Sequence, residues 1–330
     1  MPLKQSGRTF AVAVAILVSL SLVALGARRG DAAARHAVAP LVTDSGASNG
    51  VRSRASRSAS IERLVDDSLR GRSGKLFMRL VEASRSAANL RAFFRIFGDS
   101  THVLPGVYPV RDTTLLEPFA FIALRPFSDK RGASLGAYRI GFWPGEERSI
   151  ASGAYRNPAG FIEVTRDNEN LRVSEHFRLG DFLTHDQTNV WPKYVVLREA
   201  LVDKLELVVT ELERTGTPVA HMSVMSGFRT PQYNADGGET SGRAGMSRHM
   251  YGDAADVFVD NDGDGRMDDL NHDGRIDSRD AQVIIRAEER VERGHPDLIG
   301  GGGVYRATTV HGPFAHIDAR GYRARWGRAG

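Results

Sequence analysis

The stretch from Ser247 to Asp256, which reads SRHMYGDAAD, constrains this chain more than any other. It places an imidazole, His249, and a carboxylate, Asp256, seven residues apart. Two ligands on one helix face would be three or four residues apart, so this spacing does not favour a helix. It favours a loop that carries His249 into a strand over residues 254–259, with Gly252 allowing the turn. One histidine and one aspartate cannot hold a catalytic zinc ion, which usually takes three protein ligands and a water molecule.

A further histidine stands near the C-terminus, in the run 312–320, which reads GPFAHIDAR. Short apolar and polar residues alternate in this run, which is typical of a strand. Two strands of one sheet would then present His249, Asp256 and His316 to one metal ion. The Gly-rich run 300–303 lacks the Lys-Ser/Thr pair of a phosphate-binding loop, and we expect it to turn into a strand that lines the site.

These motifs resemble those of the zinc D-Ala-D-Ala peptidases, and the order and spacing are closest to their murein endopeptidase branch. The resemblance rests on Ser-x-His-x-x-Gly-x-Ala-x-Asp, on residues 226–231 (SGFRTP), and on the late Phe-x-His-Ile-Asp with residues 325–327 (RWG) behind it. It covers roughly residues 173–327. The family trims or opens bacterial peptidoglycan and shares its fold with lysostaphin-type peptidases and the hedgehog signalling domain. The resemblance therefore implies an α+β fold, with a central antiparallel sheet flanked by helices.

Carried over position by position, the resemblance implies three zinc ligands, namely His249, Asp256 and His316. It also implies that Arg229 binds substrate or the developing oxyanion, whereas the residues alone would allow a surface arginine that caps a turn. Many family members place an acidic general base three residues before the last histidine, where this chain has Pro313. Asp318 and His311 are the nearest candidates for the base. On a regular strand Asp318 would lie roughly 6–7 Å from His316, either as the base or as an acceptor that orients the imidazole.

Residues 269–280 form a second metal-binding motif inside the predicted zinc domain. Oxygen ligands stand at loop positions 1, 3, 5, 9 and 12, glycine stands at position 6, and a helix is expected over residues 281–291. This pattern is that of an EF-hand calcium loop and resembles the loops of dockerin modules. Its expected ligands, the backbone carbonyl of Arg275 included, are Asp269, Asn271, Asp273, Arg275, Asp277 and Asp280.

Another calcium loop begins nine residues earlier and overlaps the first, so the two cannot be independent EF-hands. It lacks a good twelfth ligand, and a solvated acidic loop is the alternative. Its possible ligands are Asp260, Asp262, Asp264 and Asp268. Between residues 260 and 280 stand eight aspartates and three arginines, and these aspartates would repel one another without a cation. We therefore expect a structural calcium ion in the insertion 260–280.

The N-terminus carries an uncharged apolar run over residues 9–27, after Lys4 and Arg8. Its length of about 19 residues just spans a bilayer and is long for the apolar part of a signal peptide. We favour an uncleaved membrane anchor over a cleaved signal, with residues 1–8 in the cytoplasm. Residues 28–60 are rich in Ala, Ser, Arg and Gly, which is typical of a disordered tether. The rest of the chain would lie in the cell envelope, outside the cytoplasm.

Residues 61–172 carry no motif with chemistry of its own. Apolar spacing predicts two helices within 61–97, one of which includes Leu76, Leu80 and Leu90, and short β-like runs follow over 102–163. We read this part as a helical segment and a small β-rich module that precede the zinc peptidase domain, residues 173–330. In that domain the pattern predicts a helix over 193–215 and a strand over 222–225.

Composition narrows the classes of function. The chain has no cysteine, which excludes disulfides and a cysteine-based zinc site. Its net charge is +4, yet no aromatic-interleaved basic motif points to nucleic acid, and a basic surface would face an anionic cell wall. We expect a membrane-tethered zinc peptidase that acts on peptidoglycan peptides, as a carboxypeptidase or an endopeptidase on D,D or L,D bonds. The alternatives are a non-catalytic, hedgehog-like binding module and a calcium-dependent adhesion protein.

Overall fold

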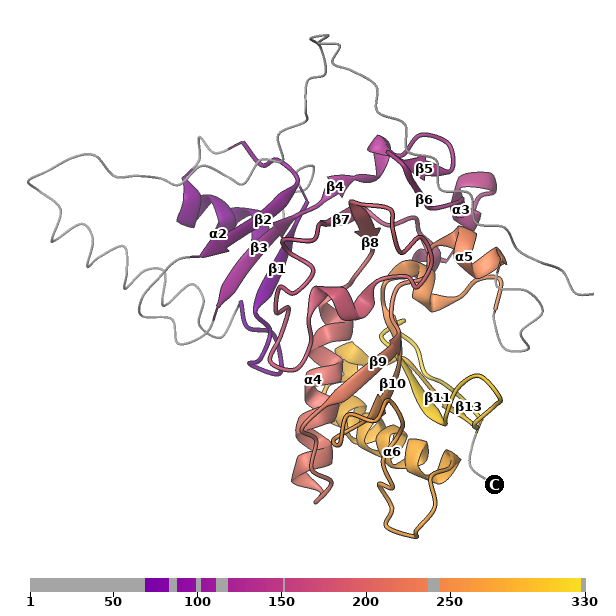
Figure 1. The fold of residues 1–330 in the computed structure, drawn as a ribbon. Helices are drawn as coiled ribbons and strands as arrows, with labels where there is room; N and C mark the ends of the chain where they lie inside the picture. Colours follow the sequence, from indigo (N-terminus) through magenta and orange to yellow (C-terminus); the bar gives the residue numbers. More distant parts are fainter. Residues whose placement is uncertain are drawn as a thin grey trace, which may run out of the picture. The chain divides into compact units, whose positions relative to one another are not determined.

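The structure is a computed structural model. It describes residues 69–82, 88–98, 102–110, 118–150, 152–236 and 244–327 (Figure 1). All of these residues belong to one compact unit, Ala37–Gly330. The predicted membrane segment 9–27 and the tether 28–60 lie outside the described residues. Within the described ranges, no helix is both long enough and apolar enough to cross a membrane.

A five-stranded sheet forms the centre of the C-terminal part, with the strand order β13-β11-β12-β10-β9. Neighbouring strands are antiparallel except for β11 and β13, which are parallel. The mixed α+β class is thereby confirmed, and the predicted strands over 222–225 and 254–259 are present. The strands are β9 (Met222–Ser226), β10 (Ala254–Val259), β11 (Gly301–Tyr305), β12 (Phe314–Asp318) and β13 (Ala324–Trp326).

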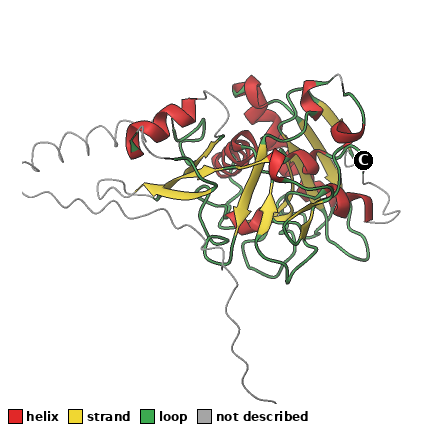
Figure 2. Cartoon of the chain, turned by 90° about the horizontal axis from the view of Figure 1, so that it is seen from above, coloured by secondary structure: helices red, strands yellow, loops and turns green. Residues whose placement is uncertain are grey.

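Two long helices, α4 (Glu199–Arg214) and α6 (Ser278–Gly294), pack against each other, and α6 also packs on β11 and β12 (Figures 1 and 2). The apolar stripe of α4 is buried, as its spacing predicts. The expected start of this helix at residue 193 is wrong. Residues Lys193–Val195 instead form strand β8, which pairs with β7. The aromatic and β-branched residues Tyr194 and Val195 suit a pleated, buried strand better than a first helical turn.

The N-terminal part of the described chain builds a three-stranded sheet covered by α2 (Ala88–Phe97). Its strands are β1 (Met78–Val81), β2 (Gly106–Val110) and β3 (Phe119–Ala123). A helix that includes Leu76 and Leu80 was expected here, and this expectation is wrong because Met78–Val81 pairs in parallel with β3. Every side chain of β3 is buried, so this partner offers apolar contact that an isolated helix would lack. Leu90 lies in α2, as predicted for its part of the pattern.

The remaining elements are short. They are the strands β4 (Arg125–Pro126), β5 (Ser134–Leu135), β6 (Tyr138–Arg139), β7 (Gly160–Val164) and β8 (Lys193–Val195), the helices α3 (Pro144–Glu147) and α5 (Pro231–Asp236), and the 3₁₀ helices η1 (Phe127–Asp129), η2 (Gly153–Tyr155), η3 (Leu179–Phe182), η4 (Arg248–Tyr251) and η5 (Pro296–Leu298).

One hydrophobic core contains residues from both the β-rich part, before residue 173, and the predicted zinc domain, residues 173–330. Trp143 and Phe161 from the β-rich part pack in the same cluster as Leu205 of α4 and Ile317 of β12. A smaller aromatic core, centred on Phe93, fills the space between α2 and the first sheet. The β-rich part therefore packs directly on the part of the chain that carries the predicted metal ligands.

Gly252, in the loop before β10, packs closely against the backbone of Val196. Its φ angle is 68°, and a Cβ atom there would lie 2.4 Å from the carbonyl oxygen of Val196. Gly216 also has a positive φ angle, 87°, but no atom lies within 4 Å of the position of its Cβ. We expect Gly216→Ala to cost about 1–2 kcal/mol of unfolding free energy, the cost of a left-handed L residue, and Gly252→Ala to cost clearly more. Chemical denaturation measures both, and equal losses would contradict the close packing at Gly252.

Candidate metal centre

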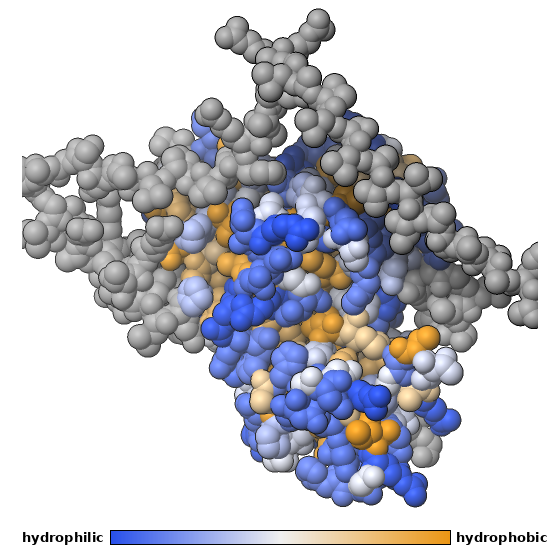
Figure 3. All heavy atoms as spheres, viewed as in Figure 1, coloured by the Kyte–Doolittle hydropathy of each residue, from blue (hydrophilic) through white to orange (hydrophobic). Residues whose placement is uncertain are grey.

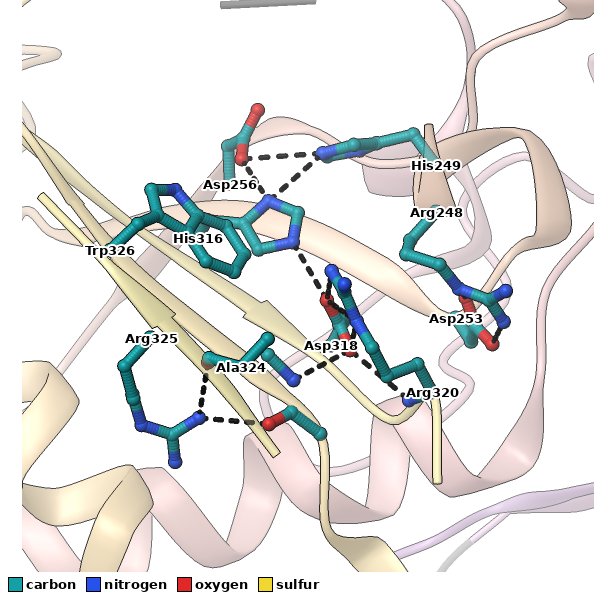
Figure 4. A network of polar contacts seen from close by, with 12 residues as sticks. Arg248, His249, Asp253, Asp256, His316, Asp318, Arg320, Ala324, Arg325 and Trp326 are labelled. Atoms are coloured by element: carbon teal, nitrogen blue, oxygen red, sulfur yellow. Dashed lines mark hydrogen bonds and ion pairs between the residues drawn. The ribbon is translucent and has the colours of Figure 1, made fainter. Parts of the chain in front are cut away.

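The two histidines and the aspartate that sequence analysis selected lie together. His249 belongs to the 3₁₀ helix η4, which leads into β10, and Asp256 stands in β10. Asp256 is the register partner of His316 on the antiparallel strand β12. Cross-strand partners point to the same face of a sheet, so the two side chains meet. Figure 4 shows His249 approaching this pair from the loop.

The ligand atoms of the three residues are close to one another. Nδ1 of His316 lies 2.9 Å from Oδ1 of Asp256 and 3.2 Å from Nε2 of His249. Nε2 of His249 lies 3.3 Å from the same Asp256 oxygen. All three side chains are buried. One ion placed among these atoms would be reached by all of them without a change of backbone.

Hydrogen bonds on the outer side of each ring determine which nitrogens face inward. Nδ1 of His249 lies 2.7 Å from the carbonyl oxygen of Gly227, which can only accept, so Nδ1 carries the hydrogen. Nε2 of His316 lies 3.1 Å from a carboxylate oxygen of Asp318 and donates to it. In the neutral rings the two inner nitrogens therefore bear lone pairs, and both face an oxygen of Asp256. Three lone pairs at this distance repel one another unless a proton on Nδ1 of His316 or a metal cation lies among them.

Burial and mutual contacts shift the pKa of all three residues. Burial lowers the pKa of His249. Burial also acts to lower the pKa of His316, but its hydrogen bonds to Asp256 and Asp318 outweigh this and raise it to about 9. Burial would raise the pKa of Asp256, yet the two histidines hold it well below its usual range. The donor set, two imidazoles and one carboxylate with oriented outer nitrogens, suits zinc.

Arg229 lies against this group. Its Nε donates to Oγ of Ser226 at 2.8 Å, and its guanidinium pairs with the second carboxylate oxygen of Asp256. Its side chain is 13% exposed, so it is largely enclosed and does not extend from the surface. A cation fixed beside a metal ligand can bind an anionic substrate group or an oxyanion.

Asp318 is fully buried, and both of its carboxylate oxygens are in use. One accepts from the backbone N–H of Gly301 at 2.7 Å, the other faces His316, and Arg320 pairs with the carboxylate. Burial would raise the pKa of Asp318, but His316 and Arg320 lower it. This geometry is that of an acceptor that orients an imidazole, the second of the two roles expected for Asp318, because an occupied, strongly acidic carboxylate is a poor proton acceptor.

The structure does not bring His311, the other expected base, into the ligand group. It stands in the loop between β11 and β12, with its ring edge-on to Phe314 at 5.1 Å and its Nδ1 2.8 Å from the carbonyl oxygen of Gly312. Trp326, in contrast, lies beside one of the candidate ligands, with its ring 5.1 Å from that of His316. Trp326 occupies the space over Gly303, where a Cβ atom would lie 2.3 Å from the indole.

Sequence reasoning missed the support behind β12. Lys204 of α4 is fully buried, and its ammonium donates to the backbone carbonyl of Asp318 at 2.7 Å. It also binds Glu288 and Glu292 of α6 at 2.7 and 2.8 Å, and Arg325 pairs with both glutamates. The available signal was a lysine inside the apolar stripe of α4, where a charge is retained only if it is paired.

The predicted calcium loop 269–280 is organised by its own hydrogen bonds. Asp280, expected at position 12, is buried and accepts from the backbone N–H groups of Leu270, Asn271 and Asp277. Arg279 pairs with Asp273 at 2.7 Å and with Asp277 at 2.8 Å. The expected ligands at positions 5, 9 and 12 are therefore already bound to an arginine or to the helix N-terminus. The side-chain oxygens at positions 1 and 3, of Asp269 and Asn271, accept from backbone N–H groups of the loop.

The earlier loop brings its carboxylates closer together. Oxygens of Asp260, Asp262 and Asp268 lie within 4.8 Å of one another. Asp260 is 4% exposed, and its Oδ1 is buried without a hydrogen-bond partner, while its Oδ2 accepts from Gly265. Asp264 accepts from the N–H of Arg266. Figure 3 shows that the lower part of this face, which holds α6 and the loops before it, is largely hydrophilic.

A third group, Glu175, His176 and Glu206, also brings possible ligand atoms within 4.8 Å. Here ion pairs account for the arrangement. Both carboxylate oxygens of Glu206 bind His176, one at its backbone N–H and one at Nδ1, each at 2.8 Å. Lys75 pairs with Glu175 at 3.0 Å, and an ammonium in that place would repel a metal ion.

Asp318→Asn tests the orienting role. The amide keeps the size of the side chain but removes the charge that favours an N–H at Nε2 of His316. We expect zinc affinity to fall about 10- to 100-fold, as is typical when the outer partner of a metal-bound histidine is lost. Competition with a chromophoric chelator measures the affinity, and Asp297→Asn, at an exposed ion pair with Arg72, is the control. Unchanged affinity in Asp318→Asn would show that Asp318 does not orient the ring.

The comparisons with known proteins add no relative to this geometry. No protein-family model, no curated protein and no solved structure matches the chain. The candidate metal centre therefore rests on its own residues: two buried imidazoles and one carboxylate, with both outer ring nitrogens hydrogen-bonded and the inner atoms within reach of a single ion.

Proposed function

We propose that this protein is a zinc-dependent peptidase that hydrolyses peptide bonds of peptidoglycan. The observation that carries the proposal is the convergence of three lone-pair atoms from His249, Asp256 and His316 in a buried place. The substrate class comes from the resemblance of the motifs to the zinc D-Ala-D-Ala peptidases and murein endopeptidases. A central sheet that is antiparallel except at β13, with α6 packed on it, is compatible with the hedgehog-like fold of that family.

The residues divide the chemistry among them. When bound, zinc would act as a Lewis acid on water and on the scissile carbonyl. His249, Asp256 and His316 would hold the ion, and Asp318 would keep the ring of His316 in its binding orientation. Arg229 would stabilise negative charge on the carbonyl oxygen. Since Asp318 is fully hydrogen-bonded, His311 is the candidate for proton transfer, which requires the β11–β12 loop to place its ring beside the substrate.

The test combines metal analysis with incubation of the protein with defined muropeptides, followed by mass spectrometry. The parent protein is expected to bind one zinc ion and to cleave a stem-peptide bond. His249→Ala and His316→Ala should lose both properties, while His221→Ala, an exposed histidine outside the ligand group, should keep both. His311→Ala should retain zinc but lose about 10²–10⁴ in turnover. Zinc retained in both ligand variants would refute the site.

A second candidate function is a non-catalytic, hedgehog-like module that binds cell-wall peptides. Pro313 favours it, because many of the similar peptidases carry an acidic base at this position. The commitment of Asp318 to His316 and Arg320 favours it as well. The two functions differ in one outcome of the same experiment: a binding module would retain muropeptides and zinc and release no product.

The proposed place of action is the cell envelope. The apolar run 9–27 would anchor the chain in the membrane, or direct its export if it is cleaved, and residues after 60 would face peptidoglycan. We propose no nucleic-acid partner.

We propose further that a structural calcium ion binds at the earlier acidic loop, through Asp260, Asp262 and Asp268. The buried, unpaired Oδ1 of Asp260 supports this placement over the later loop, where Arg279 takes up two of the expected ligands.

Calcium should therefore stabilise the protein through Asp260. At a hundredfold excess over its dissociation constant, a ligand adds about 2.7 kcal/mol to the unfolding free energy. The melting temperature should rise with calcium in the parent and in Asp277→Asn, which keeps an N-capping side chain on α6. It should not rise in Asp260→Asn. If Asp277→Asn abolishes the response and Asp260→Asn keeps it, the ion binds at the later loop.

A further inference from the structure

A continuous row of aromatic and arginine side chains leads away from the candidate metal centre. Trp326 packs near His316, and the guanidinium of Arg320 lies 5.5 Å from the ring of Trp326 and 5.5 Å from that of Tyr322. The hydroxyl of Tyr322 lies 3.3 Å from the hydroxyl of Tyr155. We call Trp326, Tyr322 and Tyr155 the aromatic strip.

The strip joins distant parts of the sequence. Trp326 stands in β13 and Tyr322 in the loop before it, whereas Tyr155 belongs to η2 in the β-rich part. Tyr155 is held from below by Arg248, whose guanidinium lies 4.8 Å from its ring and donates to the backbone carbonyl of Ala154. Arg248 directly precedes the metal ligand His249. The β-rich part therefore contributes one side chain, Tyr155, to the aromatic strip.

The arginines of this row do not offer charge to a ligand. Arg320 pairs with Asp318, and Arg248 pairs with Asp253 through two of its nitrogens. Each cation faces a buried carboxylate, and its planar group stacks on the rings and holds them in place. The exposed parts of the strip itself are aromatic faces and phenolic hydroxyls, and the exposed side chains of Arg156 and Arg323 stand next to it in the sequence. Tyr322 is 45% exposed and is the most open part of it.

Such a surface fits a sugar ring. The C–H face of a pyranose packs on an aromatic ring, and its hydroxyl and acetamido groups hydrogen-bond to phenolic oxygens at the edge. The three rings carry no charge, so a sugar packed on them needs no ionic partner, and the exposed arginines beside them can contact a neighbouring anionic group of the same ligand. A purely apolar ligand would leave the paired hydroxyls of Tyr155 and Tyr322 without their water.

We infer that the aromatic strip is a subsite for the glycan of peptidoglycan, so that the protein binds an N-acetylated sugar next to the stem peptide it cleaves. This inference rests on the proposed function for the identity of the sugar. It assigns a role to the β-rich part, which supplies Tyr155, and it predicts a preference for peptides still attached to glycan.

Two substrates separate the sugar contact from the peptide chemistry. One is a muropeptide with its disaccharide, and the other is the same stem peptide without sugar. Tyr322→Ala should lower kcat/KM on the sugar-bearing substrate about two- to tenfold more than on the free peptide. Tyr322→Phe, which keeps the ring and loses only the hydroxyl, should show a smaller loss than Tyr322→Ala. Phe142→Ala, at another exposed ring that packs on Lys130, is the control and should leave the ratio of the two substrates unchanged.

Calorimetric titration with a peptide-free N-acetylglucosamine oligomer gives a readout that does not depend on cleavage. The parent and Tyr322→Phe should bind it, and Tyr322→Ala should bind it more weakly. Parent protein that binds no oligomer and shows no preference between the two substrates would overturn the sugar subsite, even if it cleaves both. Binding of the oligomer without any cleavage would support the subsite and refute the peptidase function.

Discussion

A buried ammonium group joins the parts of this structure that must stay in register. Lys204 of α4 binds two glutamates of α6 and the main-chain carbonyl of Asp318 at the end of β12. Removing one partner of a buried ionic group is strongly destabilising, by about 3–5 kcal/mol, because it leaves an unpaired charge. The two helices therefore cannot shift along the sheet without breaking these bonds. The same bonds hold β12, the strand that carries His316, in place.

Hydrogen bonds from β12 also fix the candidate ligand side chains. Asp318 receives the N–H of Gly301 from the neighbouring strand and the guanidinium of Arg320, and then accepts from His316. On the other side, Gly227 accepts from His249. Neither imidazole is free to turn, so the inner nitrogens stay directed at Asp256. The site is thus arranged before any ion arrives, which reduces the ordering cost of binding.

The central part of the candidate site was predictable from the sequence because its information is local. The spacing of His249 and Asp256, with Gly252 between them, disfavoured one helix face and favoured a loop followed by a strand. The alternation around His316 predicted the second strand. Asp318 was recognised with two roles open, since strand geometry gives a distance between positions but not the partners of a side chain. Its bonds to Arg320 and Gly301 favour the orienting role.

Interactions between distant segments were not predictable in this way. Leu76 and Leu80 fit helical spacing, yet a buried parallel partner, β3, makes their segment a strand. The sequence around Lys204 does not predict its partners Glu288 and Glu292, which lie more than eighty residues away. In the acidic insertion the spacing identified the side-chain oxygens that could bind calcium. It did not identify the groups that compete with calcium for them, namely Arg279 and the backbone N–H groups at the N-terminus of α6.

Gly301 and Gly303 of β11 limit which substitutions the candidate site can accept. The space above them is filled by Asp318 and Trp326, which belong to two other strands. One wall of the metal centre is thus made of side chains that stand over a bare backbone. An added methyl group at position 303 would meet the indole of Trp326, and the indole would transmit the displacement to the ring of His316. The position of the His316 ring therefore depends on a residue with no side chain, on a strand that supplies none of the candidate ligands.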